Sequence, residues 1–394
     1  MMDFWAKGLE NHRKEKIKKL ALLISLLIIL ITIIVLIIVY IFNIQFRNWC
    51  DKHILGKEIL QEDTREIEID GDENPQVYAF DKYICLFRRK TIEFYNKVGT
   101  KVGEIETNIN NAKFASAGRY LAICEQDGKE FYLIDGKEKV YENEVDGTIS
   151  QINVSRSGFV SVVLSNNSYK SIVSVYNKEG KEIFKTNLVT SRVVDVSISQ
   201  DSQYLAIAEV DISGILTKST IQIVSIELAQ TKPAEAIVYK YEVPEGKLII
   251  NVEYQEKQKL ICMYNDSIEV LQEQKSSELV GFENRKTTFM TIELNNRIAI
   301  LEEKTTGEYT SDTYVNIINP ENKREIQYIA NGVVKSLHTS NKRIAINTGS
   351  ELHIISTNGF LVKKYISSTE INDIVMTDSL VGVIYRDKIQ IIYL

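Results

Sequence analysis

The stretch "SQDSQYLAIAE", residues 199–209, decides the fold of most of the chain. A polar turn leads into a short strand in which the small Ala206 stands between Leu205 and Ile207. Because β-strands favour bulky side chains, a small residue at a fixed place needs a packing reason. The order bulky, bulky, small, bulky recurs along the chain, with the small positions at Cys85, Ala122, Ser161, Ala206, Cys262, Ala299, Ala345 and Gly382.

The small residues recur with a degenerate period near forty, and each copy is flanked by further strands. An apolar strand and a polar turn precede it; a third strand and usually a more polar fourth strand follow it. Four antiparallel strands per repeat of this length are typical of a β-propeller. We therefore predict an all-β propeller of eight four-stranded blades, with seven blades as the alternative if one unit is misread.

The packing of a propeller gives a reason for the small position. The second strand of a blade lies between neighbouring blades, so a small side chain there admits a bulky one from the adjacent sheet. Cys85 and Cys262 are predicted to fill this position as buried free thiols, equivalent to Ala122 and Ala206. The last repeat ends at Leu394 after its third strand, and the alternating residues 64–70, "TREIEID", are predicted to supply the missing fourth strand.

The N-terminal part of the chain is different in character. Residues 20–42 form an uninterrupted uncharged run, long enough as a helix to cross a bilayer, and no small-residue cleavage site follows. Residues 1–19 carry six basic residues against three in the stretch after the run, which predicts a cytoplasmic N-terminus. We expect a single-pass protein of the cell membrane: cytoplasmic tail 1–19, transmembrane helix 20–42, tether 43–63 and an extracytoplasmic propeller over 64–394.

The charge of the chain limits its partners. The net charge is −6, and without the basic tail it is about −9, which disfavours nucleic acid. Long insertions over 209–219 and 302–312 are predicted to be loops between second and third strands, on the face away from the membrane. A third insertion, 229–236, is expected between third and fourth strands on the opposite face. The predicted contacts for a protein partner are Ile212, Leu216, Thr217, Lys218, Thr306, Glu308 and Tyr309.

Sequence motifs of catalysis are missing. The chain contains no nucleophile elbow, zinc-protease helix, P-loop or dinucleotide fingerprint, so we predict no catalytic, cofactor-binding or metal-binding residues. His353 is expected at a solvated or rim position of its third strand. His338, one strand earlier in the same blade, is expected to be able to approach His353, which would make at best a weak metal site. The position of His353 is shared in other repeats by Glu93, Gln222, Glu269, Asn316 and Gln390.

The stretch from residue 196 to 226, "VSISQDSQYLAIAEVDISGILTKSTIQIVSI", resembles the blades of many propellers. Together with the basic tail and the apolar helix, the whole chain resembles an uncharacterised family of membrane-anchored proteins from Firmicutes, the domain-of-unknown-function family numbered 5711. The resemblance implies no activity, cofactor or site residue. We therefore expect a non-enzymatic protein-interaction or scaffold module of the cell envelope. The alternative is a ligand sensor or hydrolase that uses the mouth of the propeller channel.

Overall fold

The computed structural model describes residues 22–40, 46, 50, 65–70, 75–283, 285–294, 296–305, 311–340 and 343–394. The chain divides into two compact units, Met1–Glu58 and Ile59–Leu394. The predicted tail 1–19 and most of the predicted tether 43–63 lie outside the described residues.

The described part of the first unit is dominated by a helix over Leu22–Tyr40. At 1.5 Å per residue its 19 residues extend about 28 Å, so its length and composition allow it to cross a membrane. Nearly all of its aliphatic side chains are exposed. The hydroxyl groups of Ser25 and Thr32 donate hydrogen bonds to the backbone oxygens of Leu22 and Ile28, both at 2.8 Å, so these polar groups are satisfied within the helix.

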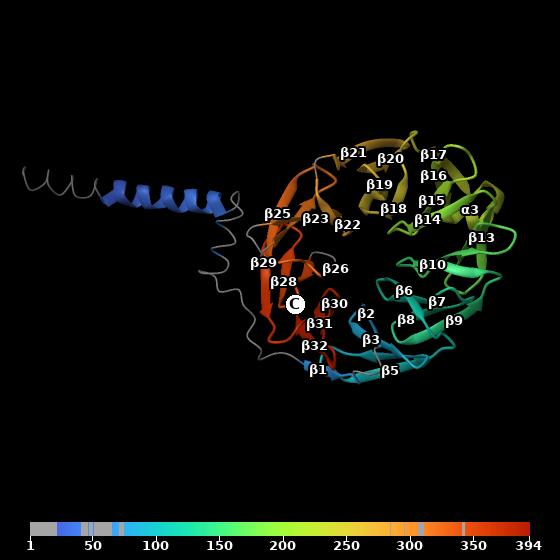
Figure 1. Ribbon diagram of the computed structural model, residues 1–394, viewed down its shortest axis with the longest axis horizontal. Helices are drawn as coiled ribbons and strands as arrows, with labels where there is room; N and C mark the ends of the chain where they lie inside the picture. The colour runs from blue at the N-terminus through green and yellow to red at the C-terminus, as the bar shows by residue number, and fades with distance from the viewer. Residues whose placement is uncertain are drawn as a thin grey trace, which may run out of the picture. The chain divides into compact units, whose positions relative to one another are not determined.

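The second unit is a β-propeller of eight four-stranded antiparallel sheets, arranged as a ring in Figure 1. Blade one contains β2 (Gln76–Phe80), β3 (Tyr83–Arg88), β4 (Thr91–Tyr95) and β5 (Lys101–Glu106). Blade two contains β6 (Ala112–Ala117), β7 (Tyr120–Glu125), β8 (Glu130–Asp135) and β9 (Glu138–Glu144). Blade three contains β10 (Thr148–Val154), β11 (Val160–Ser165), β12 (Ser171–Tyr176) and β13 (Glu182–Leu188). Blade four contains β14 (Ser191–Ile198), β15 (Tyr204–Asp211), β16 (Lys218–Ser225) and β17 (Ile237–Glu242).

The second half of the ring repeats the arrangement. Blade five contains β18 (Ile249–Tyr254), β19 (Leu260–Tyr264), β20 (Ser267–Gln272) and β21 (Lys275–Gly281). Blade six contains β22 (Thr287–Leu294), β23 (Arg297–Thr305), β24 (Ser311–Ile318) and β25 (Glu325–Asn331). Blade seven contains β26 (Ser336–Ser340), β27 (Arg343–Asn347), β28 (Glu351–Ser356) and β29 (Leu361–Ile366). Blade eight contains β30 (Asp373–Met376), β31 (Leu380–Ile384), β32 (Lys388–Tyr393) and β1 (Arg65–Glu68).

The eighth blade joins the two ends of the propeller. β1 pairs antiparallel with β32, with Ile67 opposite Ile389, so the strand expected over 64–70 lies at the outer edge of this sheet. Around the ring, each first strand contacts the first strand of the next blade, including β30 with β2, so the first strands are the innermost. The prediction of eight blades is confirmed, and seven is wrong.

Small residues on the second strands let neighbouring blades interlock. Cys85 packs in the interface with blade two, Ala122 with blade three and Ala206 with blade five. A Cβ atom added to Gly382 would lie 2.8 Å from Ile84 Cδ1 of blade one. The same face therefore carries the small residue in these blades.

Cys262 is an exception, and its predicted equivalence to Ala122 and Ala206 is wrong. It is fully buried, but it packs against blade four, whereas its neighbour Ile261 faces blade six. The turn after Tyr254 includes a 3-10 turn, Glu256–Gln258, and Tyr254 pairs with Leu260, which places Ile261 at the small position. Because side chains alternate along a strand, the shift of one residue turns the thiol to the opposite face.

The four-strand pattern is interrupted between β16 and β17. The insertion predicted over 229–236 is a short helix, α3 (Ile226–Thr231), followed by a 3-10 turn over Pro233–Glu235. The Ser225 hydroxyl caps the helix by accepting from Leu228 N. Ile226 and Ala229 are buried in the interface between blades three and four, so this insertion packs against the propeller.

Candidate functional site

The predicted partner contacts of blade four lie at the tip of a hairpin. β15 and β16 pair as far as Asp211 with Lys218, so the loop comprises residues 212–217, which we call the hairpin tip. The prediction of a loop over 209–219 is therefore too wide, since Glu209 and Ser219 are buried within the sheet. Ile212 and Leu216 are each 57% exposed, Thr217 lies at the tip and Lys218 begins β16.

The hairpin of blade six is described only in its strands. β23 and β24 pair from Ile298 with Ile318 out to Thr305 with Ser311, so both strands extend into the segment 302–312 that was predicted to be a loop. The predicted contacts Thr306, Glu308 and Tyr309 lie outside the described residues.

The two histidines of blade seven do not form a common site. Cross-strand partners point to the same face of a sheet. His338 pairs with Ala345, and His353 pairs with Ile346. Ala345 and Ile346 are consecutive in β27, so their side chains point to opposite faces. The imidazoles therefore point to opposite faces of the blade. Among the described residues, no three His, Cys, Asp or Glu side chains are close enough to hold a metal ion together.

His353 is buried, so the expectation of a solvated or rim position is wrong. Its side chain lies between blades six and seven. There the Tyr328 hydroxyl is 2.9 Å from Nδ1, and Glu351 Oε2 is 2.8 Å from Nε2. With Nε2 donating to the carboxylate, Nδ1 accepts from the tyrosine hydroxyl. A similar bond joins the next two blades, where the Tyr365 hydroxyl donates to Gln390 at 2.7 Å.

The polar position of the third strands is thus a buried structural position rather than a solvated one. All six residues that share it are nearly buried: Glu93, Gln222, Glu269, Asn316, His353 and Gln390. Glu93 is held within its own blade by Arg88, Tyr95 and Lys101. Buried polar groups need such partners, and for His353 and Gln390 the partner is a tyrosine of the adjacent blade.

A cavity of about 600 Å³ lies where the innermost strands end, and we call it the channel mouth. It opens among the turns that connect first to second strands, at the end of the ring opposite to the hairpin tip. Each of the eight blades contributes to it, through residues that include Asp81, Ser116, Arg156, Ser197, Glu253, Leu294, Ser340 and Asp378.

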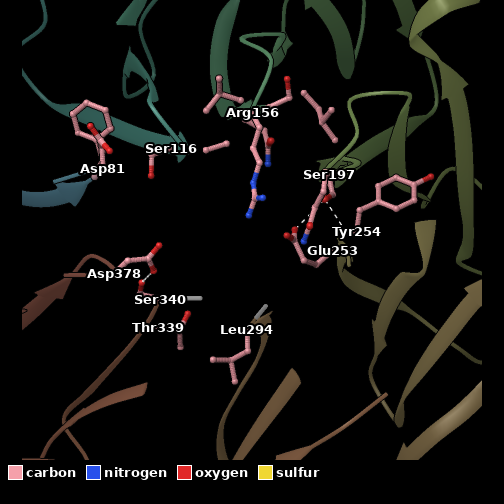
Figure 2. Close-up of a pocket in the computed structure, with 18 of the residues that line it drawn as sticks. Asp81, Ser116, Arg156, Ser197, Glu253, Tyr254, Leu294, Thr339, Ser340 and Asp378 are labelled. Atoms are coloured by element: carbon pink, nitrogen blue, oxygen red, sulfur yellow. Dashed lines mark hydrogen bonds between the residues drawn. The ribbon is translucent and has the colours of Figure 1, made fainter. Parts of the chain in front are cut away.

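The charges of the channel mouth are unevenly distributed. Among the described residues, its charged lining consists of three carboxylates, Asp81, Glu253 and Asp378, and one guanidinium, Arg156. Figure 2 shows Arg156 pointing into the open centre, with Glu253 and Ser197 on one side and Asp81 and Asp378 on the other. None of these residues is among the predicted site residues. Arg156 lies in a polar turn like that of every other repeat, and nothing in its immediate sequence distinguishes it.

Fold and cavity define the class of protein as an eight-bladed β-propeller, accompanied by one apolar N-terminal helix. The chain belongs to DUF5711, a family of unknown function, whose model matches residues 58–394. A search of curated proteins returns no match.

Solved structures share the fold at low sequence identity. BamB from Moraxella catarrhalis is 11% identical with a TM-score of 0.51, covering 84% of this chain and 98% of its own. The dihydro-heme d1 dehydrogenase NirN, solved in complex with DHE, is 14% identical with a TM-score of 0.53, covering 84% and 72%. AztD of Citrobacter koseri is 9% identical with a TM-score of 0.50, covering 77% and 88%. At these identities the likeness concerns the fold alone.

Proposed function

We propose that the protein is a non-enzymatic interaction module of the cell envelope. In this proposal the helix within 20–42 anchors it in the membrane and the propeller lies on the extracytoplasmic side. The hairpin tip of blade four then binds a partner protein.

The exposed aliphatic side chains of the hairpin tip carry this proposal. Ile215 is fully exposed at 104%, and Ile212 and Leu216 are each more than half exposed. Three large aliphatic residues within five positions, at the end of a long two-stranded extension, are unfavourable in water. Apolar side chains gathered in this way are characteristic of protein contact surfaces, in which they become buried on binding.

The test is cross-linking in cells, followed by purification of the full-length protein and identification of what is recovered with it. In the test variant Ile212, Ile215 and Leu216 are all replaced by serine. Removing 209–219 altogether would be less informative, because Gln222 donates a buried hydrogen bond to Glu209 at 2.7 Å. The control variant carries Val98→Ser and Val140→Ser, at exposed aliphatic residues away from the tip.

A partner that is recovered with the wild type and the control but lost with the triple serine variant would support the proposal. Recovery of the same partner at the same yield with the triple variant would show that the hairpin tip is not the binding surface.

A further inference from the structure

We propose that the channel mouth binds a small zwitterion of the size of an amino acid or short peptide. Arg156 would hold the carboxylate of this ligand, and Glu253 and Asp378 would hold its ammonium groups. This inference concerns the end of the propeller opposite to the hairpin tip and does not rest on the proposed partner protein.

Arg156 is available for an anion. Its side chain is exposed, points into the cavity and forms no hydrogen bond or ion pair with any residue that the structure describes. Its Cγ lies 3.9 Å from where a Cβ atom of Gly118 would be, so the stem passes over a glycine of the neighbouring blade. A guanidinium recognises a carboxylate through two parallel hydrogen bonds.

Two of the carboxylates are held in place by serine hydroxyls from neighbouring blades. Ser197 Oγ donates to Glu253 at 2.9 Å and accepts from the backbone nitrogen of Tyr254 at 3.0 Å. The Ser340 hydroxyl donates a hydrogen bond to Asp378. A carboxylate that is oriented before the ligand arrives loses less conformational entropy on binding.

The composition of the mouth disfavours other ligands. The described carboxylates are too dispersed to hold a metal ion together. Among the described lining residues, three carboxylates and one guanidinium give an excess of negative charge, which opposes a simple anion. A sugar would need an exposed aromatic face, but the aromatic lining residues Phe80 and Tyr254 are only 2% and 4% exposed. A molecule with both charges matches the lining, and 600 Å³ lies in the range of small-ligand sites.

The test is isothermal titration calorimetry on the full-length protein in detergent. The zwitterions are tri-alanine, alanyl-lysine and free lysine. Each is titrated up to about 10 mM, so that dissociation constants in the millimolar range can be measured. The two matched derivatives are tri-alanine amide, which lacks the carboxylate, and N-acetyl-tri-alanine, which lacks the ammonium group. We expect at least one zwitterion to bind. If tri-alanine is among those that bind, each derivative should bind about tenfold more weakly or worse.

Variants assign the two charges. Arg156→Ala should weaken zwitterion binding about tenfold or more, and Arg156→Lys should restore it only in part. Glu253→Gln should likewise weaken binding. Lys178→Ala is the matched control, because Lys178 is a cation of the same blade that pairs with Glu179 outside the mouth. It should leave binding unchanged.

Three results would overturn the proposal. The first is that none of the three zwitterions binds, and the second is that binding persists in Arg156→Ala. The third is that inorganic phosphate binds as tightly as the best zwitterion and with the same dependence on Arg156, which would indicate a simple anion site.

Discussion

At the scale of single residues, Gly382 shows how closely the blades interlock. A Cβ atom at this position would lie 2.8 Å from Ile84 Cδ1 and 2.9 Å from Val375 Cγ2, closer than carbon atoms approach. Gly382→Ala therefore forces neighbouring side chains to move, and overpacking of this kind costs about 1–3 kcal/mol of unfolding free energy. Denaturant unfolding, followed by far-UV circular dichroism, measures this loss of unfolding free energy.

Gly281→Ala is the control for this substitution. Gly281 ends β21, and its added Cβ atom would meet nothing closer than Glu278 Oε1 at 3.4 Å, an ordinary contact. It should leave the unfolding free energy nearly unchanged. Equal stability of the two variants would show that the small position in blade eight has room for a larger residue.

A second prediction concerns Glu351 and pH. Its carboxylate is hydrogen-bonded to His353 and, at 2.8 Å, to Lys364, and chiefly the histidine bond lowers its pKa from 4.5 to about 2. A carboxyl with a lowered folded-state pKa contributes stability above its unfolded pKa and loses it as pH falls toward the folded one. The difference in unfolding free energy between wild type and Glu351→Gln should therefore shrink between pH 4.5 and about 2.

Glu370→Gln gives the comparison for this titration. Glu370 pairs with Lys335, but its side chain is 69% exposed, so solvent screens the pair. The difference in unfolding free energy between the wild type and Glu370→Gln should be small at every pH. A difference for Glu351→Gln that stays constant across the acid range would contradict the assignment of this pKa.

At the scale of elements, the closing strand β1 holds the two ends of the propeller together. It is only four residues long, and Ile67 is its buried side chain, at 3% exposure beside Ile389. Ile67→Ala should cost about 2–4 kcal/mol of unfolding free energy, because it removes buried methyl groups from the last interface. The adjacent Glu68→Ala, at an exposed position, should be nearly neutral in the same denaturant titration. Similar small losses in both variants would mean that β1 contributes little to closure.

The strands that could be placed well from the sequence are those around the small residues, which recur with a period near forty. The small residues gave the number of blades because one recurs in the second strand of every repeat, whereas the face of Cys262 was misassigned because a short turn shifts the register by one residue. His353 was misjudged for a related reason. Along its strand His353 alternates with apolar residues, as a solvated residue would. It is buried only because the neighbouring blade places Tyr328 beside it.

At the scale of the whole molecule, the ring brings together residues that are remote in the sequence. Arg156, Glu253 and Asp378 come from blades three, five and eight, and they meet because every first strand ends at the same side of the channel. Each lies in a polar turn or strand end of ordinary composition. The propeller could therefore be predicted from its repeat, but the channel mouth could not, because its chemistry depends on closure of the ring.

The orientation of the propeller across the membrane is a prediction that a single introduced thiol can test. Three of the four native cysteines, Cys85, Cys124 and Cys262, are buried in the propeller, and burial raises the pKa of the Cys124 thiol to about 12, so these three should react very slowly. The fourth, Cys50, lies in the predicted tether and is replaced by serine in the parent chain for this test. Gly214→Cys places a thiol in the hairpin tip, where the new Cβ atom would meet only Leu216 O at 3.6 Å.

If the propeller is extracytoplasmic, a membrane-impermeant maleimide should label Gly214→Cys in intact cells, and the parent Cys50→Ser chain should stay unlabelled. His12→Cys, in the tail predicted to be cytoplasmic, should be labelled only after lysis. The reverse pattern, with the tip protected until lysis and the tail labelled in intact cells, would invert the topology. The exposed hairpin tip and the zwitterion site would then have to be matched to cytoplasmic partners, because both belong to the same propeller.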